Sequence, residues 1–156
     1  MGCRLLMFFV GLLVGIPLFA QTPFQARADQ AAMVDFAQKA AVRALDFRQG
    51  DIESLSHGRA DFTPEGWTDF LKHMEGFLDQ QGAPTFSSIF TPSGNVVVIG
   101  QENGTVHIRI PGKLKQTHNQ SSTTYRAAIE VHAGGKPIKI QQLEQTTCGG
   151  ASTACQ

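Results

Sequence analysis

The stretch DFTPEGWTDFLKHMEGFL, residues 61–78, decides the fold because it predicts the helix that covers a sheet. Thr63 is a candidate N-cap, Pro64 suits the first helical position, and Glu65 places negative charge at the positive end of the helix dipole. Apolar residues then recur on one helical face, at Trp67, Phe70, Leu71, Met74, Phe77 and Leu78. We expect this face to be buried and to pack on a core.

A longer helix is predicted before this stretch. Residues 29–47, DQAAMVDFAQKAAVRALDF, contain no Gly or Pro, and Asp29 is a reasonable N-cap. Its apolar face holds Val34, Ala37, Ala41, Ala44 and Leu45. Gly50 marks the end of this helix. A short second helix around residues 51–57 would carry Ile52 and Leu55 inward.

After Thr85 the apolar residues recur with a period of two, which is typical of strands. Residues 95–100 predict a short apolar strand, and Asn103-Gly104 predicts a hairpin turn. The following strands have inward residues at Val106, Ile108 and Ile110, then at Tyr125, Ala127, Ile129 and Val131, and finally at Ile138 and Ile140. Residues 113–123 are polar and predict a loop. Helices followed by an antiparallel meander indicate an α+β fold, with the helices on one face of a curled sheet.

The first residues, MGCRLLMFFVGLLVGIPLFAQT, predict a signal peptide over residues 1–20. Arg4 supplies the positive start, and an uncharged apolar run follows it. Cleavage after Ala20, cleavage after Ala28 and retention as an anchor remain open. Each of them predicts export, and only retention would associate the chain with the membrane.

The remaining chain predicts one domain over residues 29–145 and a flexible Gly/Ser/Thr tail over residues 146–156. The tail holds Cys148 and Cys155, which can form a disulfide in an exported compartment; two unpaired thiols are the alternative. The formal net charge is +0 and charged residues make up 17%, so no basic surface for nucleic acid is expected.

The sequence predicts no catalytic residue, cofactor site or metal site. His57, His73, His107, His118 and His132 do not have metal-ligand spacing, and the strand positions of His107 and His132 predict outward side chains. Tyr125 with Asp46 or Asp61 could serve an enzyme only inside an apolar pocket that raises the pKa of the carboxyl group. We expect structural roles for all three.

Three segments resemble the DotI/IcmL/TraM family, which are components of type IVB secretion and conjugation systems. They are FTPEGWTDFL (residues 62–71), GTVHIRIPGKLKQ (residues 104–116) and YRAAIEV with PIKIQQLEQ (within residues 125–145). The first is the most specific. Its residues Thr63, Pro64, Glu65, Gly66 and Trp67 form a structural motif. The chain departs from the family at its front, where a short signal-like run replaces a cytoplasmic segment and a membrane helix.

The resemblance implies a nuclear-transport-factor-two-like (cystatin-like) cone, in which helices pack on a curved antiparallel sheet. It also implies a non-enzymatic assembly or scaffold component in the periplasm. Its partners would be other secretion-system envelope proteins, and a homo-oligomer is left open. The alternative is a periplasmic small-ligand-binding protein or enzyme that uses the cone interior. An interior filled by Phe86, Phe90, Ile108 and Ile129 would argue against the alternative.

Overall fold

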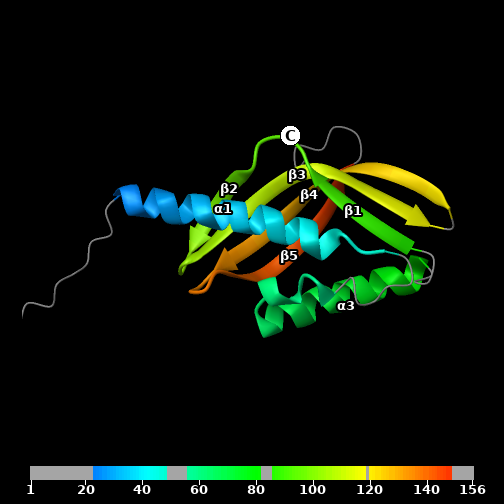
Figure 1. Cartoon of the computed structure of the whole chain (residues 1–156), viewed down its shortest axis with the longest axis horizontal. Coiled ribbons are helices and arrows are strands. Elements are labelled where there is room, and N and C mark those ends of the chain that lie inside the picture. The colour runs from blue at the N-terminus through cyan, green and yellow to red at the C-terminus, as the bar shows by residue number, and fades with distance from the viewer. Residues whose placement is uncertain (1–22, 49–55, 82–85, 119, 149–156) are drawn as a thin grey trace, which may run out of the picture.

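The computed structural model describes residues 23–48, 56–81, 86–118 and 120–148, which contain two long helices and a five-stranded sheet. Both helices lie against one face of the sheet (Figure 1). Buried apolar side chains from the helices and from the sheet form one core. The α+β class predicted from the sequence is therefore confirmed. The predicted signal segment lies outside the described residues, and so do residues 51–55 of the short helix expected around residues 51–57.

Helix α1 (Pro23–Leu45) begins upstream of Asp29, so the prediction that Asp29 is its N-cap was wrong. Proline suits the first turn of a helix, and no glycine interrupts the chain from there to Leu45. The predicted buried face is confirmed for four small or apolar residues, Ala37, Ala41, Ala44 and Leu45, which are at most 1% exposed. Beyond Leu45 the chain turns, and Phe47 exchanges two backbone hydrogen bonds with Ser88 on strand β1.

Helix α3 (Pro64–Gln81) follows a short 3-10 helix (Arg59–Asp61), and it begins where the sequence predicts. The hydroxyl of Thr63 accepts a hydrogen bond of 3.1 Å from the Gly66 N–H, which makes Thr63 the N-cap. The apolar face is confirmed by three buried side chains, those of Trp67, Phe70 and Met74. The side chains of Phe77 and Leu78 lie outside the described part of the structure.

The sheet is antiparallel throughout, with strand order β1-β3-β4-β5 and with β2 also paired to β3. Its strands are β1 (Phe86–Pro92), β2 (Val97–Glu102), β3 (Thr105–His118), β4 (Ser121–Gly134) and β5 (Lys139–Cys148). Asn103 and Gly104 both have positive φ, at 49° and 79°, which confirms the predicted tight turn between β2 and β3.

Strands β3 and β4 form a hairpin much longer than the sequence predicts. The polar segment 113–123 was expected to be a loop, but all but its turn residues belong to these two strands. The Thr117 and Ser122 hydroxyls face each other across the strands at 2.9 Å, which shows how polar residues support this end of the hairpin. The prediction failed because a strand exposed to water has no apolar alternation to reveal it.

Pro111 lies in the middle of β3 without breaking the sheet. Strands β1 and β2 both pair with the same edge of β3. Strand β2 pairs with it up to Arg109 and β1 pairs with it from Gly112, so Pro111 lies between the two partners. Its carbonyl accepts a 2.9 Å hydrogen bond from Ser93, which follows β1. Proline has no backbone N–H to donate. At Pro111 this costs the sheet no hydrogen bond, because β3 changes partner from β2 to β1 at this position.

Two sequence predictions fail toward the ends of the sheet. Tyr125 lies opposite the buried Leu114, on the inner face as predicted, yet it is 40% exposed. Among the described residues, the pairing of β5 with β4 ends at Arg126, so Tyr125 has a strand neighbour on the β3 side alone. Strand β5 runs to Cys148, so residues 146–148 belong to the sheet and not to the expected tail. Cys155 lies outside the described residues, and its disulfide with Cys148 stays a prediction.

Candidate interaction surfaces

The motif around Thr63 holds the start of α3 against β5. The Thr63 N–H donates a 2.9 Å hydrogen bond to the carbonyl of Ile140. A side chain at Gly66 would place its Cβ 2.6 Å from the carbonyl oxygen of Gln141, so only glycine permits this approach. Pro64 and Glu65 are exposed, and Trp67 is buried. The motif therefore positions an element, and its residues do not form a catalytic arrangement.

The interior between the sheet and the helices is filled by large apolar side chains. Phe86, Phe90, Ile108 and Ile129 are each at most 3% exposed. The ring of Phe90 lies over Gly112, where an added Cβ would approach it to 2.5 Å. The burial of these four side chains means that the cone is filled at these positions, which argues against a ligand cavity there.

The three residues considered for enzyme chemistry are not gathered in a buried site. Tyr125 is 40% exposed, and Asp46 is exposed after the end of α1. The Asp61 carboxylate accepts a 2.7 Å hydrogen bond from Arg43 and so links the 3-10 helix to α1. The carboxylate of Asp61 therefore has a structural role, and Tyr125 lies in an exposed position.

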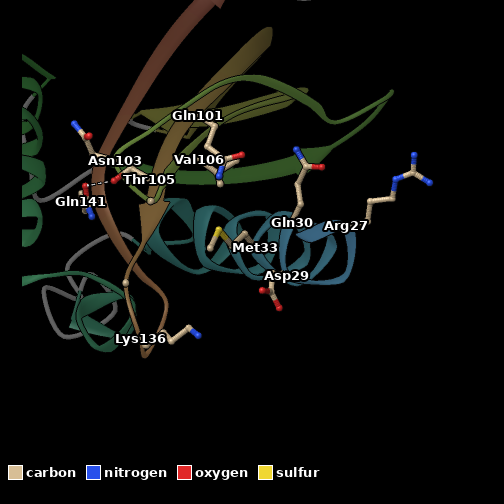
Figure 2. Close-up of a pocket in the computed structure, with 12 residues that line it drawn as sticks. Arg27, Asp29, Gln30, Met33, Gln101, Asn103, Thr105, Val106, Lys136 and Gln141 are labelled. Carbon is tan, nitrogen blue, oxygen red and sulfur yellow. Dashed lines mark hydrogen bonds between the residues drawn. The ribbon is translucent and has the colours of Figure 1, made fainter. Parts of the chain in front are cut away.

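A pocket of about 540 Å³, lined mostly by polar residues, lies at one end of the molecule, beside the N-terminal part of α1. Figure 2 shows its two walls: Arg27, Gln30 and Met33 from the helix, and residues of the strand turns on the other side. Thr105 on β3 donates a 3.0 Å hydrogen bond to Gln141 on β5, across the end of β4 that lies between these strands. The lining mixes amides with both signs of charge, so it favours no single class of small ligand.

A second hollow, of about 340 Å³, lies between the end of α1, helix α3 and strand β5. Its apolar residues belong to the core, whereas its rim is polar. The lining residues are Leu45, Phe70, His73, Met74, Leu143, Glu144 and Gln145. The His73 ring nitrogen lies 2.8 Å from the carbonyl of Asp69 in the preceding turn of its own helix. This contact holds the His73 ring to its own helix at the rim of the hollow.

The outer face of the sheet carries a histidine pair that the sequence analysis did not predict. His107 on β3 lies opposite His132 on β4, and the two rings stack with centroids 4.0 Å apart and planes 5° from parallel. The next cross-strand pair on the same face is Arg109 with Glu130, and Arg109 donates two hydrogen bonds to the Glu130 carboxylate, at 2.7 and 2.9 Å. The alternation of β3 predicts that His107 faces outward, but only the register of the β3–β4 hairpin places it against His132.

The pKa of His132 lies below its ordinary value, chiefly because partial burial disfavours the charged ring. The neighbouring His107 lowers this pKa further, whereas Glu144 and Glu130 raise it. Two stacked imidazoles cannot both take a proton without repulsion. In residues 23–48, 56–81, 86–118 and 120–148, no three His, Cys, Asp or Glu side chains are placed to hold a metal ion together.

Strand β2 presents the largest exposed aliphatic side chains next to this histidine pair. Val97 is 46% exposed and Ile99 is 42% exposed, and Val97 lies opposite Arg109 on the outer face. Ile89 on β1 is 48% exposed.

None of the helices in the described part of the chain is long and apolar enough to cross a membrane.

Solved structures of type IV secretion proteins have the same arrangement of helices and sheet. An IcmL-like type IV secretion system protein from Legionella pneumophila matches with a TM-score of 0.67 and 11% identity, over 80% of this chain and 97% of that one. The periplasmic domain of DotI matches with a TM-score of 0.65 and 17% identity, over 76% of this chain and 95% of that one. The chain has the DotI-like and IcmL-like fold.

A third match extends the likeness to the VirB8 proteins. CagV, a VirB8 homolog from the type IV secretion system of Helicobacter pylori, has a TM-score of 0.61 and 12% identity, over 76% of this chain and 99% of that one. The nuclear-transport-factor-two-like arrangement and the resemblance to DotI, IcmL and TraM are thus confirmed at the level of the fold. No family model matches the chain, and no curated protein matches it.

Proposed function

We propose that the chain is a non-enzymatic component of a type IVB-like secretion or conjugation apparatus, and that it works in the periplasm as an assembly or scaffold subunit. The observation that carries the proposal is the shared fold: an IcmL-like secretion protein and the periplasmic domain of DotI align with 80% and 76% of this chain. The predicted export signal supports the same compartment. Its partners would be other envelope proteins of the apparatus.

The packing of the interior favours this function over a ligand-binding or enzymatic one. A small-molecule site requires a concave apolar pocket with polar groups converging in it. Here the centre of the cone holds Phe90, Ile108 and Ile129, and Tyr125 lies in an exposed position near the end of a strand. An assembly subunit needs a rigid fold with available surfaces, and a filled core provides that rigidity.

Gene deletion with complementation tests the proposal in the host. Deletion is expected to reduce transfer of substrates by the secretion system, and the wild-type chain is expected to restore it. A tagged chain should copurify with other envelope components after crosslinking, and it should be accessible to protease added to spheroplasts. Undiminished transfer after deletion, or a protease-protected chain in intact spheroplasts, would contradict the proposal.

The double variant Tyr125→Phe with Asp61→Asn separates a scaffold from an enzyme. It removes the phenol and one of the two candidate carboxylates, Asp46 and Asp61, that acid–base chemistry could use, and it changes side-chain volume little. We expect it to complement the deletion as well as the wild-type chain does, at equal protein level. Loss of transfer with normal protein level and normal copurification would favour the enzymatic alternative.

A further inference from the structure

We propose that His107 and His132 bind a divalent transition-metal ion on the outer face of the sheet, each through one ring nitrogen. The two residues lie opposite each other on the adjacent strands β3 and β4, and their ring centroids are 4.0 Å apart. Neither residue belongs to the hydrophobic core, so neither ring is needed to hold the helices on the sheet. The proposal is independent of the secretion function.

The spacing of the two rings is close to what a shared metal ion requires. Histidine nitrogens bind Zn²⁺ at about 2.0–2.1 Å, so two nitrogens in neighbouring coordination positions lie about 3 Å apart. From a separation of 4.0 Å, the rings have to approach each other by about 1 Å. Their planes are 5° from parallel, so each ring has to turn about its Cβ–Cγ bond for the nitrogen lone pairs to converge. This torsion has a broad minimum in histidine, and such a turn therefore costs little free energy.

The surroundings of the pair leave room for this turn. Both histidines are partly exposed, and among the residues that the structure describes no hydrogen bond holds either imidazole. On the β2 side, His107 lies opposite Gly100, which has no side chain to confine the ring. A Cβ added to Gly100 would lie 3.5 Å from the Nδ1 atom of His107. On the β5 side, His132 lies opposite Gln142, whose amide donates a 2.6 Å hydrogen bond to Glu144.

The charges beside the pair favour a cation. The next cross-strand row on this face holds Arg109, Glu130 and Glu144, with Glu130 in the middle. Arg109 forms an ion pair with Glu130 at 2.7 Å, whereas Glu144 accepts its hydrogen bond from the neutral amide of Gln142. The row therefore has one more negative than positive charge, and this excess attracts a cation to the face that carries the histidines.

The type of ligand selects the class of metal. Neutral imidazole suits Zn²⁺, Cu²⁺ and Ni²⁺, whereas Mg²⁺ and Ca²⁺ prefer oxygen ligands. At a given nitrogen site Cu²⁺ binds more tightly than either Ni²⁺ or Zn²⁺, so Cu²⁺ should have the highest affinity here. In the described part of the chain no group of three His, Cys, Asp or Glu side chains is placed to hold a metal ion. Water would therefore occupy the remaining coordination positions, and we expect an open site that yields its ion to a strong chelator.

Titration of Cu²⁺ into the full chain, prepared without a histidine tag, tests the proposal. At substoichiometric Cu²⁺, the electron paramagnetic resonance spectrum should show two imidazole nitrogens bound to the ion. His107→Gln and His132→Gln each remove one ligand, so each should weaken Cu²⁺ binding by at least about tenfold, the loss that even an outer-shell partner of a metal ligand causes. His73→Gln is the matched control. Its side chain is 70% exposed on α3 and is not part of the pair, so this variant should bind Cu²⁺ like the wild type.

Zn²⁺, which has no redox chemistry, tests whether the ion stabilises the folded chain. A ligand that binds the folded state raises stability, so Zn²⁺ should raise the urea midpoint of the wild type and of the His73→Gln variant. A chelator should reverse this rise. The His107→Gln and His132→Gln variants should show no such rise, and circular dichroism spectra that match the wild type would show that they are folded.

Three results would overturn the proposal. The first is a wild-type chain that binds Cu²⁺ no more tightly than the His107→Gln and His132→Gln variants. The second is a two-nitrogen spectrum that persists in either of these variants. The third is an equal loss of Cu²⁺ binding in the His73→Gln control.

Discussion

Trp67 shows how one residue connects the helix motif to the core. Its ring lies edge-on to Phe62 at 5.4 Å and is tilted against Phe70 at 5.5 Å, measured between ring centroids. Such aromatic pairs contribute beyond the area they bury. The cluster joins the residue before the N-cap to the buried face of α3, and so it secures the helix where it meets β5.

Replacing Trp67 by alanine should lower the free energy of unfolding by about 3–5 kcal/mol, because it leaves a cavity under α3. Lys72→Ala, at an exposed position on the same helix, should change it by less than about 0.5 kcal/mol. The urea midpoints of the purified proteins measure both. A stable Trp67→Ala protein that has lost binding to a partner would instead mean that the indole serves an interface.

The stability of the protein should depend on pH through His132. Its pKa is lowered in the folded state, mainly by burial and then by His107, so the unfolded state binds a proton first as the pH falls. The free energy of unfolding should therefore decrease as the pH falls below about 6.5 toward the lower folded pKa. His132→Gln should flatten this dependence between about pH 7.5 and 5.5.

Urea titrations at several pH values measure this effect, and His73→Gln is the control. The His73 side chain is 70% exposed on α3 and is not part of the stacked pair, so its replacement should leave the slope unchanged. If His132→Gln keeps the slope of the wild type, the stacked pair does not couple folding to protons.

At the scale of the element, the first turn of α3 depends on a hydroxyl. Thr63→Ala removes the acceptor for the Gly66 N–H and should cost about 1 kcal/mol of stability, whereas Thr63→Ser keeps the hydroxyl and should cost less. Urea midpoints and the exchange rates of the amides of residues 65–67 measure the difference. Equal losses for alanine and serine would mean that packing of the threonine methyl group matters more than the cap.

The elements also differ in how far local sequence predicts them. The start of α3 was predicted to the residue, because the cap, the proline and the apolar spacing all lie within a few positions. The start of α1 was missed, since helix-compatible residues continue upstream of Asp29 without a stop signal. The β3–β4 hairpin was predicted too short, because its end, residues 115–124, is polar on both faces.

At the scale of the whole molecule, the helices and the sheet share one core and should unfold together. Phe47 and Phe62 connect the segments that follow α1 and precede α3 to strands at opposite edges of the sheet. Trp67 is the only tryptophan of the chain, so its fluorescence reports the contact between α3 and the sheet. Fluorescence and far-ultraviolet circular dichroism should give the same urea midpoint. A fluorescence change at lower urea would mean that α3 detaches first.

The sequence by itself determined those features that depend on neighbours along the chain. The cap at Thr63, the turn at Asn103-Gly104, and the alternation that buries Val106, Ile108 and Ile110 are set by residue chemistry and by the period of each element. These features were enough to predict the α+β class and the layer arrangement. The motif around Trp67 was enough to suggest the fold family.

Only the tertiary structure decided how the strands are combined. The pairing of both β1 and β2 with one edge of β3 places Pro111 between them and leaves β2 uncovered among the described elements. The register of β3 with β4 stacks His107 on His132 and carries Tyr125 into an exposed position. Register and strand order depend on contacts between residues far apart in the chain, which no local pattern encodes.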